Sequence, residues 1–125
     1  MTISRRQARR QALFLLYQWD LSGQQIGSQY AGEIDPWARA MAEGVSERAG
    51  ELDGRITAAA EGWTADRLGA VERSALRVAV HELETREVPA EVAINEAVAF
   101  TKRYASEDGA RLVNGILGRI QREAA

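Results

Sequence analysis

Arginine side chains crowd the beginning of the chain, where Arg5, Arg6, Arg9 and Arg10 stand without an acidic neighbour. A guanidinium binds phosphate oxygens through two parallel hydrogen bonds and stacks on bases, so this pattern is typical of an RNA-binding site. In a helix these cations would lie at the positive end of the macrodipole, at a cost of roughly 0.3–1 kcal/mol each, and would repel one another at i,i+4. Phosphates would offset both costs. We therefore expect Arg5, Arg6 and Arg9 to lie on an exposed helix end and contact phosphates; the alternative is a solvated face without a ligand.

A second cluster with the same chemistry lies near the end of the chain. Lys102 and Arg103 supply positive charge, and Tyr104 stands at an expected helix end just before Ser106. An unpaired base stacked on an aromatic ring contributes about 1–3 kcal/mol, so Tyr104 is a candidate stacking platform, with a core position as the alternative. Arg111 is expected one helical turn past Ser106, where it faces the same ligand.

The residue types of this chain give little indication of a catalytic or metal-binding site. His81 is the only histidine and the chain has no cysteine. His81 and Glu82 are neighbours on an expected helix, so they point about 100° apart and not toward one metal ion. No nucleophile, phosphate-binding loop or carboxylate pair stands out. We expect no enzymatic activity and no cofactor.

Composition and charge favour a single globular domain with one local anion site. The chain has 125 residues, of which 46% are hydrophobic and 27% charged. The first 19 residues hold four arginines and no acid, whereas all 18 acidic side chains follow, for a net charge of −2. The longest apolar run, residues 12–17, is far below the roughly 20 residues that span a bilayer. The absence of cysteine and of a signal-peptide pattern predicts a cytoplasmic protein.

The apolar pattern has a helical period throughout and shows no strand. A first helix is expected from Ser4 to about Leu21, and a second begins at Asp35 and Pro36, with one or two glycine-induced breaks before residue 60. Thr64 is the expected cap of the next helix.

The second half of the chain predicts three more helical features. The segment VERSALRVAVHEL is apolar around most of its circumference and should be the buried central helix. Val88 and Pro89 end it. The following helix should bury Ile94, Ala97, Val98, Thr101 and Ala105. Ser106 should cap the last helix.

The sequence resembles one known family. The runs LGAVERSALRVAVHEL and VPAEVAINEAVAFTKRYASEDGARLVNGIL resemble the signature of the NusB family of transcription antitermination factors. The opening RRQARRQALFLLYQWD resembles that family's arginine-rich first helix. The resemblance implies an all-α fold, a compact bundle of about six to seven helices in two packed helical subdomains, with residues 1–125 as a single RNA-binding domain. It implies no catalysis.

The resemblance also implies partners. The ligand would be boxA RNA of ribosomal RNA transcripts, bound together with the small-subunit ribosomal protein NusE in an RNA polymerase antitermination complex. The arginine-rich helix and the later cluster then supply the candidate RNA-binding residues Arg5, Arg6, Arg9, Lys102, Tyr104 and Arg111. Tyr17, Asp66 and Glu72 match positions that the family uses for NusE, and an acidic, aromatic patch complements a basic protein.

Three further residues of the family-like motifs lead to predictions about stacking and burial. The family usually has a phenylalanine just before VNG, where this chain has Leu112, which puts one stacking platform in doubt. Asn95 and Asn114 lie in otherwise apolar helices, and we expect buried amides that lock helix junctions.

Two other functions remain open on the sequence alone. The chain could be a purely protein-binding helical adaptor whose arginines meet an acidic partner. It could also be the RNA-docking module found in some ribosomal-RNA methyltransferases, although no cofactor-binding domain follows in this sequence. A homodimer through an exposed Trp37 or the broad apolar faces is possible.

Overall fold

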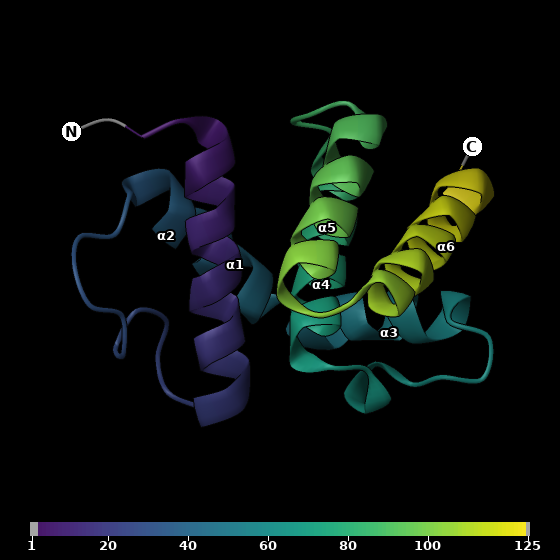
Figure 1. Ribbon diagram of the computed structural model, residues 1–125, viewed down its shortest axis with the longest axis horizontal. Coiled ribbons are helices and arrows are strands. Elements are labelled where there is room, and N and C mark those ends of the chain that lie inside the picture. Colours follow the sequence, from purple (N-terminus) through teal and green to yellow (C-terminus); the bar gives the residue numbers. More distant parts are fainter. Residues whose placement is uncertain (1–2, 125) are drawn as a thin grey trace.

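The computed structural model describes residues 3–124, which form six α-helices and one short 3-10 helix, with no strand in that range (Figure 1). The elements are α1 (Arg5–Ser22), α2 (Pro36–Glu47), α3 (Ala49–Ala59), η1 (Ala65–Arg67), α4 (Ala70–Thr85), α5 (Ala90–Tyr104) and α6 (Glu107–Ala124). The all-α prediction and the expected helix number are confirmed. None of the described helices is both long and apolar enough to cross a membrane.

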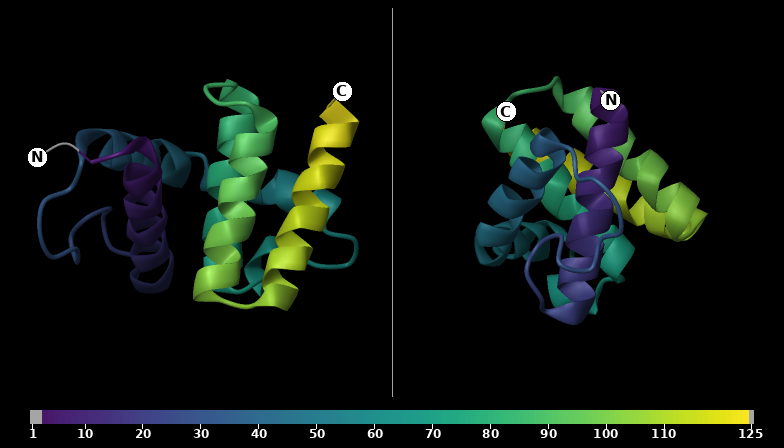
Figure 2. Two further views of the ribbon diagram at one scale, coloured as in Figure 1. Left: turned by 45° about the horizontal axis from the view of Figure 1, so that its top comes forward. Right: turned by 90° about the vertical axis from the view of Figure 1, so that its left-hand side faces the viewer.

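Helix α4 is the element on which the others assemble, and it contacts α1, α2, α3, α5 and α6. Figure 1 shows α1 and α2 on one side and α5, α6 and α3 on the other, and the left view of Figure 2 shows the same division. The helices therefore form two packed subdomains. Residues 74–80 of α4 are buried without interruption, which confirms the central helix. A helix apolar on all sides is stable only when neighbours cover its whole circumference.

Local signals determine where most helices begin. Ser4 and Gln7 form a reciprocal capping box at α1, and Gly23 ends that helix in the left-handed conformation. Asp35 caps α2 by accepting from Ala38 N, and Ser106 Oγ accepts from Gly109 N at 2.9 Å in the first turn of α6. These side chains satisfy amide groups that a helix end leaves without partners.

The sequence suggested that Thr64 caps α4, but the structure shows that it does not. The chain first forms the turn η1, extends at Leu68, and begins α4 only after Gly69. The Thr64 side chain makes no capping hydrogen bond. One break, at Arg48, separates α2 from α3. Ala105 is exposed because it follows the last residue of α5.

The expectation that Asn95 and Asn114 are buried is wrong. Both lie exposed on the outer faces of α5 and α6. The buried faces of the two helices consist mostly of small or apolar side chains, namely Ala93, Ile94, Ala97, Phe100 and Thr101 on α5 and Gly109, Ala110, Val113, Ile116, Leu117 and Ile120 on α6. The asparagines of both motifs therefore remain available to a ligand.

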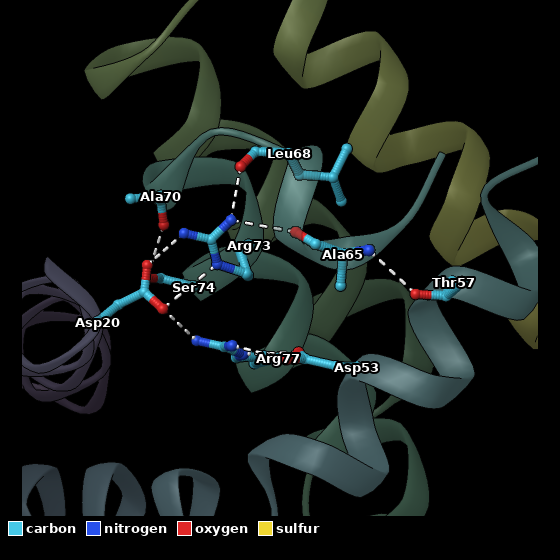
Figure 3. A network of polar contacts seen from close by, with 9 residues as sticks. All are labelled: Asp20, Asp53, Thr57, Ala65, Leu68, Ala70, Arg73, Ser74 and Arg77. Atoms are coloured by element: carbon cyan, nitrogen blue, oxygen red, sulfur yellow. Dashed lines mark hydrogen bonds and ion pairs between the residues drawn. The ribbon is translucent and has the colours of Figure 1, made fainter. Parts of the chain in front are cut away.

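A polar network joins α1, α3 and η1 to α4 (Figure 3). Arg77 Nη1 donates to Asp20 Oδ1 at 2.9 Å, and Arg77 Nε donates to Asp53 Oδ1 at 2.7 Å. Arg73 also pairs with Asp20 and donates to the carbonyl oxygen of Ala65 at 3.0 Å. The Arg77 and Asp20 side chains are only 6% and 10% exposed. Burial by itself raises the pKa of Asp20, but the hydrogen bonds from Arg73 and Arg77 outweigh it, so the pKa is lowered.

We expect Asp20→Asn to lower the free energy of unfolding at pH 7 by roughly 3 kcal/mol, the low end for removing one partner of a buried ion pair. Because folding lowers the pKa of Asp20, its contribution is complete above the unfolded pKa of about 4. The contribution is lost as the pH falls through that value and then through the lower folded pKa. Urea denaturation from pH 7 to pH 3 should therefore show the difference from the wild type shrinking below about pH 4.

Glu123→Gln is the control, because Glu123 is an exposed carboxylate that pairs with Arg119 on the surface of α6. This change should alter stability little at any pH in that range. A gap between wild type and Asp20→Asn that stays constant down to pH 3 would contradict the role assigned to the Asp20 carboxylate.

Candidate nucleic-acid interface

A groove of about 310 Å³ lies between the beginning of α1 and the end of α5. Its lining residues are Arg6, Arg9, Arg10, Leu13, Glu96, Ala99, Phe100, Lys102, Arg103 and Tyr104. The first half of α1 and the last two turns of α5 thus bring both arginine-rich parts of the chain together. Lys102 and Arg103 lie in the last turn of α5, where the helix dipole favours cations.

Two aromatic rings, Phe100 and Tyr104, line the groove, and Phe14 packs against both of them. Tyr104 packs edge-on against Phe14 with ring centroids 5.0 Å apart, and its ring lies 4.8 Å from that of Phe100. Arg103 lies over the Tyr104 ring, and its Nε donates to the Tyr104 hydroxyl at 3.1 Å. Tyr104 nevertheless remains 37% exposed. Phe14, Phe100 and Arg103 hold the ring in place, and its exposed part is accessible to a ligand.

Arg6 lies on the rim of the groove and reaches across it to α5. Its Nε is 3.2 Å from Glu96 Oε1 and 3.3 Å from Oε2. Its side chain is 66% exposed, and within residues 3–124 the two terminal nitrogens make no hydrogen bond. One edge of the guanidinium is therefore fixed by Glu96 while the other is open to an anion.

The expectation that Arg9 lies on an exposed helix end is wrong. Arg9 is 4% exposed and forms a bidentate pair with Glu82 of α4, with Nε–Oε1 at 3.0 Å and Nη2–Oε2 at 2.8 Å. Arg9 lies beside the apolar stripe through which α1 packs on α4, so its charge meets a carboxylate there. Arg9 forms part of the groove floor, with its guanidinium already paired.

Arg5 and Arg10, the other two arginines at the start of α1, also differ in their surroundings. Arg5 lies over the ring of Trp37 at 4.2 Å, outside the groove, which leaves Trp37 half-buried and corrects the expected exposure of that ring. Arg10 is exposed, and no ion pair of Arg10 exists among the residues the structure describes. Partners distant in sequence thus offset the expected repulsion for three of the four arginines. Arg10 and the open edge of the Arg6 guanidinium remain available to bind an anion.

A neighbouring hollow between α5 and α6 contains the other predicted cation. Lys102 belongs to both the groove and this hollow, and Arg111 lines the hollow together with Glu107 and Asn114. Lys102 lies 3.8 Å from Glu107, and Arg111 pairs with Asp108 one turn earlier on α6. Leu112 is half-buried in a third hollow, between α3 and α6, and not in the groove that Tyr104 lines.

The structure therefore brings Arg6, Arg9, Lys102 and Tyr104 together, places Arg111 next to them, and leaves Arg5 outside. Arg103, which the sequence analysis named as a charge beside Lys102, also lines the groove, whereas Arg10, Glu96 and Phe100 were missed as members of this site. The spacing of Arg10 four residues after Arg6, which puts both on one helix face, is a signal that could have identified it.

The three residues predicted to face a protein partner lie near the Asp20 network. Tyr17 is half-buried on α1, and Asp66 is exposed in η1, where a hydrogen bond from Thr64 lowers its pKa. Glu72 is half-buried in the first turn of α4, and its carboxylate fills the space beside Gly69 and Gly109. A Cβ at Gly69 would lie 2.8 Å from Glu72 Oε1. Glu72 therefore also has a packing role.

His81 takes part in a structural contact. Its Nδ1 lies 2.8 Å from Arg48 Nη1. Burial lowers the pKa of His81, and the charge of Arg48 lowers it further, so the neutral ring accepts a hydrogen bond from the guanidinium. In the described part of the chain no three His, Cys, Asp or Glu side chains gather as metal ligands.

An all-α fold with a cationic, aromatic groove defines a class of helical nucleic-acid-binding proteins, and the comparisons give the family. A model of the NusB family matches residues 6–122. The transcription antitermination protein NusB of Rubrobacter xylanophilus is 40% identical over 122 residues, covering 92% of this chain and 88% of that protein. That of Solibacter usitatus is 36% identical over 131 residues, covering 96% and 90%. The chain belongs to the NusB family.

Solved structures agree with this assignment. NusB of T. maritima superposes with a TM-score of 0.86 at 32% identity, covering 98% of this chain and 94% of that one. A crystal structure of the antitermination factors NusB and NusE in complex with double-stranded RNA contains a chain with a TM-score of 0.82 and 29% identity, covering 95% and 96%.

We expect Arg9→Met to lower the free energy of unfolding by roughly 3–5 kcal/mol, because it leaves the buried Glu82 carboxylate without its partner. Replacing both residues, Arg9→Met with Glu82→Leu, should recover most of that loss. The neighbouring exposed substitution Arg10→Met should change stability little. Urea denaturation of the variants makes the comparison, and equal stability of Arg9→Met and Arg10→Met would contradict the structural role of Arg9.

Proposed function

We propose that this chain is an RNA-binding transcription antitermination factor that binds boxA RNA of ribosomal RNA transcripts together with NusE. The observation that carries the proposal is the α1–α5 groove, in which cations from both ends of the chain surround a partly exposed tyrosine ring. Single-stranded RNA combines a regularly charged backbone with unstacked bases, and this groove offers guanidinium groups for the first and a ring for the second.

The charge distribution supports RNA over an uncharged ligand. The groove and the adjoining α5–α6 hollow are lined by six of the chain's 16 Lys and Arg side chains and by two of its 18 acids. The protein as a whole carries a net charge of −2. Concentrating cations on one face of an otherwise acidic protein steers a polyanion to that face.

The proposed NusE face is formed by Tyr17, Asp66 and Glu72, which come from the second half of α1, from η1 and from the start of α4. An exposed acid and a half-buried aromatic ring suit a basic ribosomal protein. The proposal draws further support from the related chain that was crystallised with NusE and double-stranded RNA.

The other functions fit less well. A protein-binding adaptor would need an acidic partner at the groove, and its affinity would depend less steeply on salt than RNA binding does. The relatives that match over most of their length are antitermination proteins, which favours this role over a methyltransferase docking module. We take residues 1–125 as one domain without catalytic activity. A factor that acts on nascent bacterial transcripts works in the cytoplasm.

We expect Arg6→Ala combined with Arg10→Ala to weaken binding of boxA RNA and to reduce its salt dependence. Each lost phosphate contact should reduce the slope of log K against log salt by about 0.7 for a single strand. Fluorescence anisotropy titrations with boxA RNA and a scrambled RNA, at several salt concentrations, measure both quantities. Arg67→Ala is the control, because Arg67 is an exposed cation in η1 that does not line the groove. Wild-type affinity and slope in the double variant would rule out this site.

We expect Asp66→Lys to weaken binding to NusE while leaving the affinity for boxA RNA alone unchanged. Asp66 is exposed in η1, so reversal of its charge opposes a basic partner without disturbing the core. Glu87→Lys, an exposed charge reversal in the loop after the opposite end of α4, is the matched control. Calorimetric titration with NusE that gives equal affinities for the two variants would show that the partner binds elsewhere.

A further inference from the structure

The side chains that line the α1–α5 groove offer many hydrogen-bond donors and few acceptors. Five of its lining side chains are Arg or Lys, which donate hydrogen bonds and accept none. The Tyr104 hydroxyl already accepts from Arg103. Glu96 is the one acidic side chain in the lining. A groove that bound only phosphates would gain nothing from a carboxylate, which repels them.

The Glu96 carboxylate is held in place and still has unused capacity. Both of its oxygens face a single donor, Arg6 Nε, at 3.2 and 3.3 Å, and the side chain is 23% exposed. Two carboxylate oxygens offer about four lone-pair directions. Further donors from a ligand in the groove can therefore reach Glu96 while Arg6 keeps it oriented.

Glu96 lies on the same helix as the two aromatic rings that line the groove. Phe100 and Tyr104 follow Glu96 at four-residue steps, so the three side chains lie on one face of the helix. The groove volume of about 310 Å³ is at the lower end for sites that take a small organic molecule. Glu96 and Tyr104 are two turns apart on α5, about 12 Å of helix rise. An unpaired base that lies between them in the groove would present its hydrogen-bonding edge toward Glu96 and Arg6.

Guanine is the base whose edge matches this pair. Its Watson–Crick edge carries two adjacent N–H donors, N1–H and the N2 amino group, next to the acceptor O6. A carboxylate accepts from both donors, and a guanidinium beside it donates to O6. Adenine and cytosine offer one amino group next to a ring nitrogen that accepts. Uracil has one N–H between two carbonyl oxygens, which a carboxylate repels.

We propose that Glu96 is a specificity-determining residue that selects an unpaired guanine in the α1–α5 groove by accepting hydrogen bonds from its N–H groups. Arg6 is the positioning residue of the pair, because its Nε orients the carboxylate. This inference rests on the proposed RNA-binding function and adds which base the groove selects.

The test compares short oligouridylates that are uniform or carry one central guanosine, with fluorescence anisotropy as the readout. The wild type should bind the guanosine-containing RNA about tenfold more tightly, as expected for one bidentate base contact. Inosine, which lacks only the N2 amino group, should lose several-fold of that preference. Glu96→Gln should bring the preference close to one, while the affinity for uniform oligouridylate rises because a negative charge has been removed.

Glu107→Gln is the matched control. It removes the same charge from the neighbouring α5–α6 hollow, next to Lys102, without touching the groove. It should raise the affinity for both RNAs alike and keep the tenfold preference. Thermal melting of both variants checks that the fold is intact.

Three results would overturn the inference: a wild type that does not distinguish guanosine from uridine, a Glu96→Gln variant that keeps the preference, or a variant that weakens both RNAs equally. In each of these cases RNA still binds, so the proposed function survives. Absence of binding to every RNA, boxA included, would instead remove both the function and the inference.

Discussion

The buried ion pair between Arg9 and Glu82 is the contact on which the arrangement of the two subdomains depends. It joins α1 to α4 across 73 positions of the sequence, and both side chains are nearly without solvent contact. Displacing α1 by one turn would leave two buried charges unpaired, at a cost of several kcal/mol. The pair thus fixes the register of α1, and that register puts Arg6 and Arg10 on the rim of the groove. The Asp20 network fixes the far end of the same helix.

The parts of the fold that the sequence predicts are those set by local interactions. Ser4, Asp35 and Ser106 act within three residues of their own positions, and each marks a helix start. The apolar period reports which side of a helix is covered, whatever covers it. The central position of α4 follows from a pattern that is apolar on every side. Thr64 shows the limit of such signals, because the chain forms η1 and extends at Leu68 before α4 begins after Gly69.

The groove depends on contacts that no local pattern contains. Arg6 and Glu96 are 90 positions apart, and nothing in either neighbourhood specifies that they meet. The four arginines of the first turns look alike in sequence, yet one is buried, one covers Trp37 and two border the groove. Asn95 and Asn114 were expected inside because their helices are apolar, but other residues, such as Ala97 of α5, form the buried faces. Side-chain roles here follow from tertiary packing.

The groove has one wall in each subdomain, since α1 belongs to the first and α5 to the second. A ligand held by both walls acts as a clamp across the joint, and it can bind tightly only while the subdomains are docked. Binding and docking then share one free energy: a ligand adds to the stability of the joint by mass action, and a joint that opens part of the time lowers the apparent affinity by the fraction it is open. Ligand binding at this groove and docking of the two subdomains are therefore thermodynamically coupled.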